Sequence, residues 1–537
     1  MAPMAEPRWE TARRKLRSDP DVLKNANECA YLVSHLSSLA DDVVEGRGGA
    51  VKDQVVGIVH ALQKYFEAVQ AESFVGKSES EAAKTFAEWN KQQIKAYQGA
   101  LKRCCESKLT PPGTRAETIF AVMDSIRLEA GKRFQVENLE FVLHLVCRGN
   151  QLSDLLLDIL TTEYFKFVDV AFYSLRYLAR LCADLKAGQI SRANPNEGED
   201  GEDDDDDDED AVCNAFDLLR SLTKCVRGFL DAESGDVATL PCLTRRAIAE
   251  DEEDEEDEDD ATAGPSSDAK LPNYLQEKPI KHAFTHAWLS FLRLSLPQQV
   301  LKKALTMLPE EIIPTMTTPI LLSDILTHAV DQKGLVGILA LHGLFILVVH
   351  HGLEYENFYK QLYNMVTLST FLTKYRAKFY RLVDTFLSTP LIPAYVVAAF
   401  IKRFARLAIQ APPHGALVAM AFVFNLIRRH VSCIILLEGR GEDGTDPYDA
   451  EEEDPAKARA LESSLWELET LKSHYHHEVS RFVSVFKRDM TKRNKYTEID
   501  LEKFVTRSYD ETYARENTKR LKMCAVKLPE KDRKDLF

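Results

Sequence analysis

The sequence lacks the cysteine spacing of a disulfide framework or a zinc module. Its ten cysteines are scattered over 537 residues, and no two of them form a C-x-x-C pair. Zinc modules and small disulfide-stabilised domains depend on such short, regular spacings. We therefore expect free cysteines that behave as small buried apolar side chains in a reducing compartment, with no metal and no cofactor.

Motifs of three common enzyme classes are also missing. The sequence has no G-x-x-x-x-G-K-[ST] phosphate loop, no H-E-x-x-H zinc site and no G-x-S-x-G nucleophile turn. His282 and His286 would share one helix face, but no third metal ligand stands near them. In the acidic loop Asp443–Asp454, Pro447 and Ala450 interrupt the alternating oxygen ligands of a calcium loop. We predict that the chain is not an enzyme.

Long hydrophobic runs are scarce. The longest, Gly334 to Val349, is interrupted by His342 and is shorter than the ~20 residues that span a bilayer. The segment MAPMAEPRWETARRKLR contains no apolar stretch like that of a secretory signal. We therefore expect a nuclear or cytosolic protein with no membrane partner.

Acidic residues are concentrated in two short windows. Residues 197–210 hold twelve acids and no lysine or arginine, and Glu250–Asp260 are eleven acids in succession. Outside these windows the chain has 68 basic and 61 acidic residues, a net charge of +7. This charge is compatible with weak attraction to nucleic acid. A segment of one charge sign cannot bury enough apolar area to offset its ordering entropy. We therefore expect a disordered acidic insertion at 191–210 and a disordered acidic linker at 233–270.

The remaining chain shows apolar residues recurring at three and four positions, the pattern of amphipathic helices. This pattern fills residues 1–190 and returns in a helix at 211–232. After residue 271, breaks at proline and glycine separate hairpins of roughly 35 to 45 residues, the size of HEAT or armadillo pairs. We predict an all-α, HEAT/armadillo-like helical-repeat solenoid, with a globular all-α body as the alternative. Residues 491–537 form either a basic tail for RNA or nuclear import, or a solvated helix exterior.

Two stretches of the C-terminal half have distinctive sequences. The first is LLSDILTHAVDQKGLVGILALHGLFILVVHHGLEYENFYKQLY, and the second is DPYDAEEEDPAKARALESSLWELETLKSHYH. Together with the helical residues between them, they resemble the CCAAT-binding-factor/Mak family of ribosome-assembly factors over roughly residues 290 to 475. We accordingly predict a domain of this type at 271–490.

The resemblance implies a non-catalytic scaffold of the nucleus and nucleolus. Similar proteins form a complex with nucleolar protein fourteen and act with other proteins of the small-subunit processome in pre-rRNA processing and small ribosomal subunit assembly and export. Pre-ribosomal RNA would be met through the particle, and no small-molecule substrate is implied. The alternative is a helical-repeat nuclear transport receptor or an acidic histone-chaperone-like protein, because helical solenoids serve the first and acidic tracts the second.

A partner-binding role is predicted for the second of these stretches, whose sequence is the most specific to the family. It contains Tyr448, Asp449, Asp454 and Trp466. Asp454 is expected to cap a helix that begins at Pro455, because acids and proline suit a helix N-terminus. Trp466 is favoured as a core residue, with an exposed anchor as the alternative. The apolar stripe of this helix would be Ala458, Leu461, Leu465 and Leu468.

A second candidate segment interleaves basic and aromatic residues, with Lys374, Arg376 and Arg381 as its cations. Such a pattern could meet phosphates and stack bases. The competing interpretation is a helix that buries its aromatic residues and solvates its charges. Lys402 and Arg406, four residues apart, are likewise expected to be solvated on the outer face of their helix.

Overall fold

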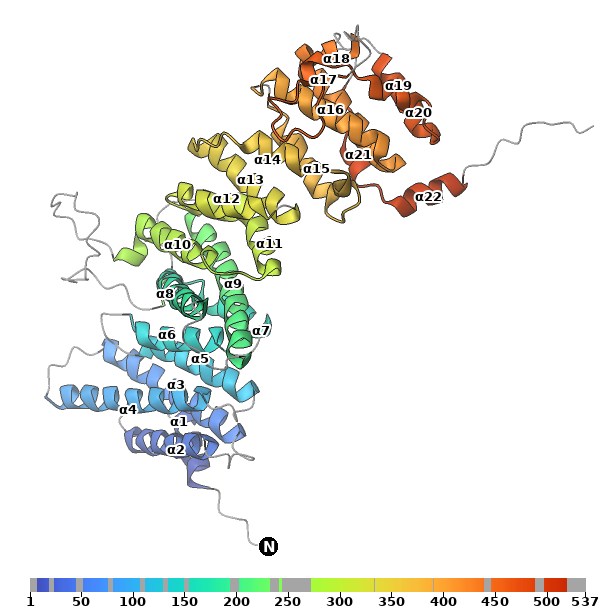
Figure 1. Cartoon of the computed structure of the whole chain (residues 1–537). Coiled ribbons are helices and arrows are strands. Elements are labelled where there is room, and N and C mark those ends of the chain that lie inside the picture. The colour runs from blue at the N-terminus through green and yellow to red at the C-terminus, as the bar shows by residue number, and fades with distance from the viewer. Residues whose placement is uncertain are drawn as a thin grey trace, which may run out of the picture. The chain divides into compact units, whose positions relative to one another are not determined.

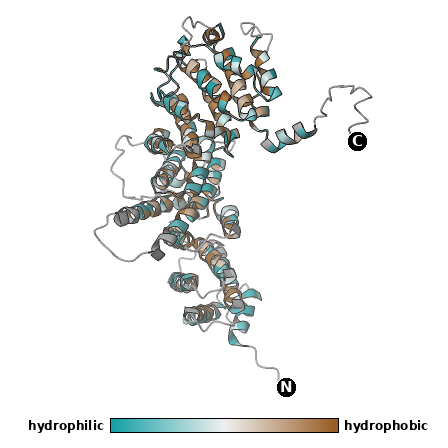
Figure 2. Ribbon diagram, turned by 45° about the vertical axis from the view of Figure 1, so that its right-hand side comes forward, coloured by the Kyte–Doolittle hydropathy of each residue, from teal (hydrophilic) through white to brown (hydrophobic). Residues whose placement is uncertain are grey.

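A computed structural model shows the chain as two compact units, residues Met1–Leu322 and Ser323–Phe537. Every regular element in the part of the chain that it describes is a helix, which confirms the all-α prediction, while the repeat architecture stays a prediction. Hydrophobic and hydrophilic residues alternate along these helices (Figure 2). The described residues are 7–18, 24–44, 52–75, 81–106, 112–128, 134–148, 154–193, 202–231, 241–243, 272–332, 334–389, 391–438, 446–487 and 497–518.

The first unit is built from helices that pack on neighbours close to them in sequence, and successive helices lie beside one another in Figure 1. Among these pairs, α2 packs on α4, α3 and α4 pack on α5, and α8 packs on α9 and α10. Short connections favour such packing between helices that follow one another closely, whereas α8 and α10 pack together although more than 80 residues separate them in the sequence. The α-helices are α1 (Arg8–Ser18), α2 (Ala26–Val44), α3 (Lys52–Val75), α4 (Glu81–Glu106), α5 (Pro112–Leu128), α6 (Val136–Cys147), α7 (Asp154–Ile159), α8 (Val168–Ala193), α9 (Glu202–Leu230), α10 (Glu277–Leu292) and α11 (Gln298–Met307).

Part of the first acidic window is helical, which corrects the prediction of a disordered insertion at 191–210. Helix α8 continues to Ala193, and α9 begins at Glu202 rather than at residue 211. The buried residues Ala211 and Val212 anchor the helix that follows, and acids are favourable at the positive N-terminal end of a helix. The window Glu250–Asp260 and the predicted linker around it lie outside the described residues, apart from 241–243.

The two acidic windows should therefore respond differently to deletion. Removing residues 202–210 shortens α9 at its N-terminus, and we expect a loss of about 1–2 kcal/mol in unfolding free energy from the lost helix and its favourable charges. Removing Glu250–Asp260 should change it by less than about 0.5 kcal/mol, because eleven acids in succession cannot bury apolar area. Chemical denaturation followed by circular dichroism measures both, and equal losses would contradict the assignment.

The boundary between the units differs from the one predicted at residue 271. Helix α10 packs on α8 and α9 of the first unit. Its Trp288 is completely buried, and the indole donates a hydrogen bond to the Thr223 hydroxyl of α9 at 3.0 Å. The contacts therefore place the boundary after Leu322, because composition marks a linker but does not reveal which helices pack together.

The second unit has the antiparallel pair α16 and α17 at its centre. The rings of Phe404 and Phe422 stack between these helices with centroids 4.9 Å apart, and both are buried. The α-helices of this unit are α12 (Ser323–Asp331), α13 (Gly334–His351), α14 (Phe358–Met365), α15 (Arg376–Phe386), α16 (Ala394–Gln410), α17 (Pro413–Arg429), α18 (Ile435–Glu438), α19 (Trp466–Lys472), α20 (His477–Val483), α21 (Glu502–Val505) and α22 (Tyr509–Thr518).

Helix α13 is long and apolar enough to cross a membrane by length and composition. Half of its residues are buried inside the structure, and it packs on α12, α14 and α15. A core helix passes the same composition test, so this feature is weak evidence for a membrane span.

The described part of the predicted basic tail returns to the helices of the second unit. The Asn425 amide of α17 donates to the Ile499 carbonyl at 2.8 Å, and its oxygen accepts from the Ile499 N–H at 2.9 Å. Nearby, Arg429 pairs with Asp384 at 2.7 Å and with Glu498 at 2.9 Å. Residues 497–505 are therefore a bound strap on this unit rather than a separate tail.

Candidate partner-binding site

Helix α16 carries a completely buried lysine, which corrects the prediction that Lys402 is solvated. Its ammonium donates to Glu467 Oε1 at 2.6 Å, to Asp446 Oδ2 at 3.2 Å and to the Ser464 carbonyl at 2.8 Å. An ammonium group has three donors, so these acceptors use all of them. All three acceptors come from residues 446–467, and this segment therefore covers the outer face of α16.

Asp446 joins most of the polar groups in this segment. Its Oδ1 accepts from the Tyr448 N–H at 3.2 Å and from the Ser463 hydroxyl. Its Oδ2 accepts from Arg406 Nη2 at 2.7 Å and from the Trp466 indole at 2.8 Å. Burial opposes ionisation of Asp446, but hydrogen bonds from Ser463 and Trp466 hold its pKa well below its ordinary value. Asp446 is therefore a charged acceptor at neutral pH.

Glu467 is the second carboxylate at this site and is fully buried. Besides Lys402, it has Arg406 Nε at 2.8 Å from its Oε1. Burial raises the pKa of Glu467, and the hydrogen bond from Lys402 acts in the opposite direction. We call the following residues the Asp446 cluster: Lys402, Arg406, Asp446, Ser463, Trp466 and Glu467.

Trp466 is an exposed residue, which corrects the expectation that it belongs to the core. Its side chain is 39% exposed, and the Arg406 guanidinium lies 4.6 Å from the ring centroid. The hydrogen bond to Asp446 and this cation–π contact both fix the orientation of the ring. The cluster therefore presents a large aromatic surface in one defined position, which is the property of an interface anchor.

The expected helix from Pro455 does not form, and α19 begins only at Trp466. The Asp454 carboxylate does accept a hydrogen bond from the Ala456 N–H at 3.0 Å, but Arg459 then takes a left-handed conformation with φ of 51°. Further on, the Leu465 N–H donates to the Leu436 carbonyl at 2.8 Å. These tertiary contacts replace helical hydrogen bonds and override local propensity.

The other predicted residues of this block have different surroundings. Tyr448 is buried, and its hydroxyl lies 2.7 Å from that of Tyr363. Asp449 is exposed, and its carboxylate accepts from the Glu451 N–H at 2.9 Å. Asp454 is half-buried. The structure thus makes Tyr448 a support of the segment and leaves Asp449 and Trp466 accessible.

The second predicted segment lies in and just before α15, and two of its cations contact the strap at 497–505 and the residues just after it. Arg376 donates to the Val505 carbonyl at 3.4 Å and to the Arg507 carbonyl, and Arg381 pairs with Glu502. Lys374 is exposed. The aromatic residues Phe379 and Tyr380 are buried, so they have no free face for stacking on bases. A structural role fits Arg376 and Arg381.

Comparison with known proteins agrees with this division of the chain. Residues 337–483 match the CBF/Mak21 family. The matched region, which we call the CBF/Mak21 domain after this similarity, starts within α13 and ends with α20. It contains the whole Asp446 cluster and excludes the strap at 497–505. The family resemblance of the sequence is thereby confirmed.

Several curated proteins are similar to the chain. The nucleolar complex protein 4 homolog of Homo sapiens is 50% identical over 210 residues, which are 39% of this chain and 41% of that protein. Homolog B of Xenopus laevis is 45% identical over 253 residues, 47% of each chain. The protein NUCLEOLAR COMPLEX ASSOCIATED 4 of Arabidopsis thaliana is 29% identical over 508 residues, 87% of this chain and 85% of the relative. The matches to these two animal proteins span less than half of those relatives' length.

Proposed function

We propose that this protein is a non-catalytic nucleolar scaffold in ribosome biogenesis. The CBF/Mak21 domain carries the proposal, because it contains a buried charge cluster whose geometry serves to present a surface rather than to perform chemistry. The names of the similar proteins, which place them in a nucleolar complex, support the same setting. Lys402 and Asp446 are each saturated by internal partners, so neither is available as an acid, base or nucleophile.

At a finer level, we infer that the protein acts in the small-subunit processome as a complex with nucleolar protein fourteen. Its role there would be in pre-rRNA processing and in small ribosomal subunit assembly and export. The family resemblance is the source of this assignment, and the architecture is compatible with it because stacked helices offer large exposed surfaces for protein partners.

The partner would dock on the exposed side of residues 446–472. The indole of Trp466 is hydrogen-bonded to Asp446. Asp446 is followed in the sequence by the exposed acids Asp449, Glu451 and Glu453. An aromatic anchor combined with acidic groups suits a partner segment that carries both apolar and basic side chains. The cluster holds the anchor in place before binding, which reduces the entropy lost on association.

A co-purification experiment tests the proposed partnership. We expect residues 323–537 to retain nucleolar protein fourteen, whereas residues 1–322 should not, because the CBF/Mak21 domain lies entirely in the second unit. The full chain should also sediment with pre-ribosomal particles. Binding only by the full chain would contradict the assignment to one unit, and co-sedimentation with importins or histones instead would favour the transport or chaperone alternative.

A further inference from the structure

Helix α1 carries an excess of positive charge on its exposed side. Its sequence RWETARRKLRS contains five basic residues and one acid, Glu10. The buried residues Ala12 and Leu16 face α2 and α3, on which α1 packs. The basic side chains must therefore lie toward solvent or along the edges of this contact.

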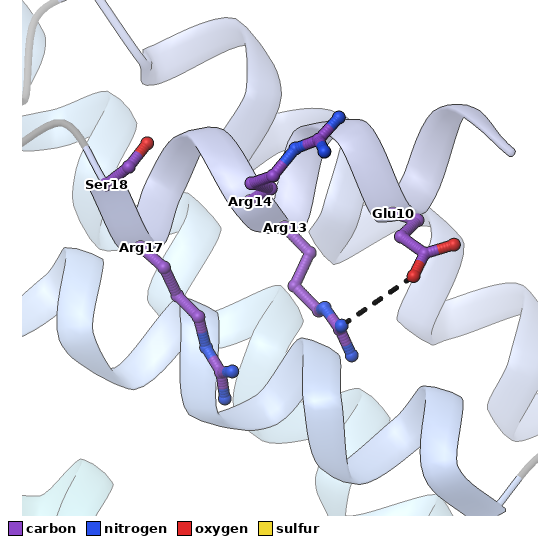
Figure 3. Close-up of a pocket in the computed structure, with 5 residues that line it drawn as sticks. All are labelled: Glu10, Arg13, Arg14, Arg17 and Ser18. Atoms are coloured by element: carbon purple, nitrogen blue, oxygen red, sulfur yellow. Dashed lines mark ion pairs between the residues drawn. The ribbon is translucent and has the colours of Figure 1, made fainter. Parts of the chain in front are cut away.

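Several of these cations surround one shallow pocket of about 280 Å³, lined by Glu10, Arg13, Arg14, Arg17 and Ser18 (Figure 3). Glu10 is the one carboxylate among the lining residues, and it lies 3.9 Å from Arg13 Nη2. Lys64 of α3 adds a further cation, because its ammonium donates to the Arg17 carbonyl at 2.9 Å. Among the lining residues and Lys64, positive charge thus exceeds negative charge.

The position of Arg13 depends on a glycine in the neighbouring helix. A Cβ atom at Gly57 would lie 2.4 Å from Arg13 Nη1. The glycine therefore leaves the space in which the guanidinium lies against α3. On the other side, the Arg13 guanidinium is 5.5 Å from the Trp9 ring centroid. These contacts hold one guanidinium of the patch in place and lower the entropic cost of using it to bind an anion.

Arg17 has a different environment. Its side chain is exposed and makes no ion pair with any residue in the ranges that the structure describes. It stands four residues after Arg13, a spacing that brings two side chains to within about 5–6 Å at their Cβ atoms. In Figure 3 the side chains of Arg13 and Arg17 extend from the same side of α1. Two guanidiniums side by side suit neighbouring phosphate groups of one chain.

We propose that this α1 basic patch, which consists of Arg13, Arg17 and Lys64, binds the phosphate backbone of RNA. The pocket is not enclosed, so a polymer can lie across it. No large apolar side chain is exposed among the described residues of α1, α2 and α3, and a membrane-inserting surface would need such residues. The choice of RNA rests on the proposed function in ribosome assembly.

Fluorescence anisotropy with a labelled, unstructured single-stranded RNA tests the proposal on the full-length protein. The test variant combines Arg13→Gln, Arg17→Gln and Lys64→Gln. The control combines Lys84→Gln, Lys91→Gln and Lys95→Gln on α4, which are exposed and change the net charge equally. We expect the test variant to raise the Kd at least tenfold and to reduce the slope of log Kd against log salt by about 2, at ~0.7 per phosphate contact. The control should change the Kd by less than about threefold.

Three outcomes would overturn the proposal. They are absence of RNA binding by the unmodified protein, equal weakening in the test and control variants, and equal competition by anionic lipid vesicles or an acidic peptide. If the triple variant has a lowered melting temperature, the single variant Arg17→Gln replaces it, because that side chain has no ion pair to lose among the described residues. An unchanged Kd for Arg17→Gln would also contradict the proposal. Co-purification of nucleolar protein fourteen by the same variants separates failure of RNA binding from failure of the proposed function.

Discussion

Replacement of Lys402 by methionine is expected to lower the unfolding free energy of the second unit by about 3–5 kcal/mol, the usual cost of removing one member of a buried ion pair. Methionine keeps most of the side-chain volume but none of the three donors. Glu467, which is fully buried, would then lose its hydrogen bond from the ammonium. Whether that carboxyl stays charged or takes up a proton, its desolvation is no longer compensated.

Urea denaturation of residues 323–537 measures this effect. Trp466 is the only one of the chain's four tryptophans in this fragment, so its fluorescence reports directly on the cluster. Arg406→Gln is the matched control and should cost about 1 kcal/mol or less, because the Arg406 side chain is 34% exposed. The double variant Lys402→Met with Glu467→Met should recover much of the loss, since two apolar groups can replace a buried pair. Equal losses for Lys402→Met and Arg406→Gln would refute a buried, specific role.

The helices of this protein could be predicted from its sequence, whereas the Asp446 cluster could not. Apolar periodicity identifies α16, and Ala399, Phe400 and Phe404 of its apolar stripe are buried, whereas Tyr395 at its start is 45% exposed. The same periodicity places Lys402 on the outer face of the helix, which would be solvated if nothing covered it. What covers it is a segment more than 40 residues later, since Lys402 and Asp446 are 44 positions apart. Single-sequence patterns contain no information about such distant contacts.

Local helix signals also failed where tertiary contacts compete with them. The acidic run that ends at Asp454, followed by Pro455, is a favourable helix start. The next α-helix, α19, nevertheless begins only at Trp466, because Ser463 and Leu465 make hydrogen bonds to Asp446 and Leu436 instead of helical ones. Conversely, the run of acids before residue 211 forms part of α9 although its charge predicts disorder. In both places the deciding factor is what lies next to the segment in space. One signal was available: Lys402 directly follows the apolar run AYVVAAFI and precedes Phe404 and Ala405 in the same helix, so a charged residue stands between apolar turns.

Trp466→Ala should weaken association with nucleolar protein fourteen by about 2 kcal/mol or more, roughly 30-fold in Kd, as expected for an aromatic anchor at an interface. The same change should cost the isolated protein only about 1–2 kcal/mol of stability, because the side chain is 39% exposed, compared with about 3–5 kcal/mol for a fully buried tryptophan. Affinity should therefore fall more than stability. This ratio distinguishes an anchor from a core residue.

Two further variants complete the test: one isolates the role of the Trp466 indole donor, and the other is a control at a second exposed aromatic residue. Trp466→Phe keeps an aromatic face but removes the indole donor to Asp446, so its affinity should fall between those of the wild type and Trp466→Ala if the fixed orientation of the ring contributes to binding. Tyr475→Ala, which removes an 81% exposed aromatic residue just after α19, should leave affinity within about twofold, as expected for a residue outside the hot spot. Isothermal titration calorimetry and thermal melting on the same samples give both quantities. If Trp466→Ala left the Kd unchanged while lowering the melting temperature, the ring would serve only to close the Asp446 cluster, and the partner surface would have to be sought elsewhere on the CBF/Mak21 domain.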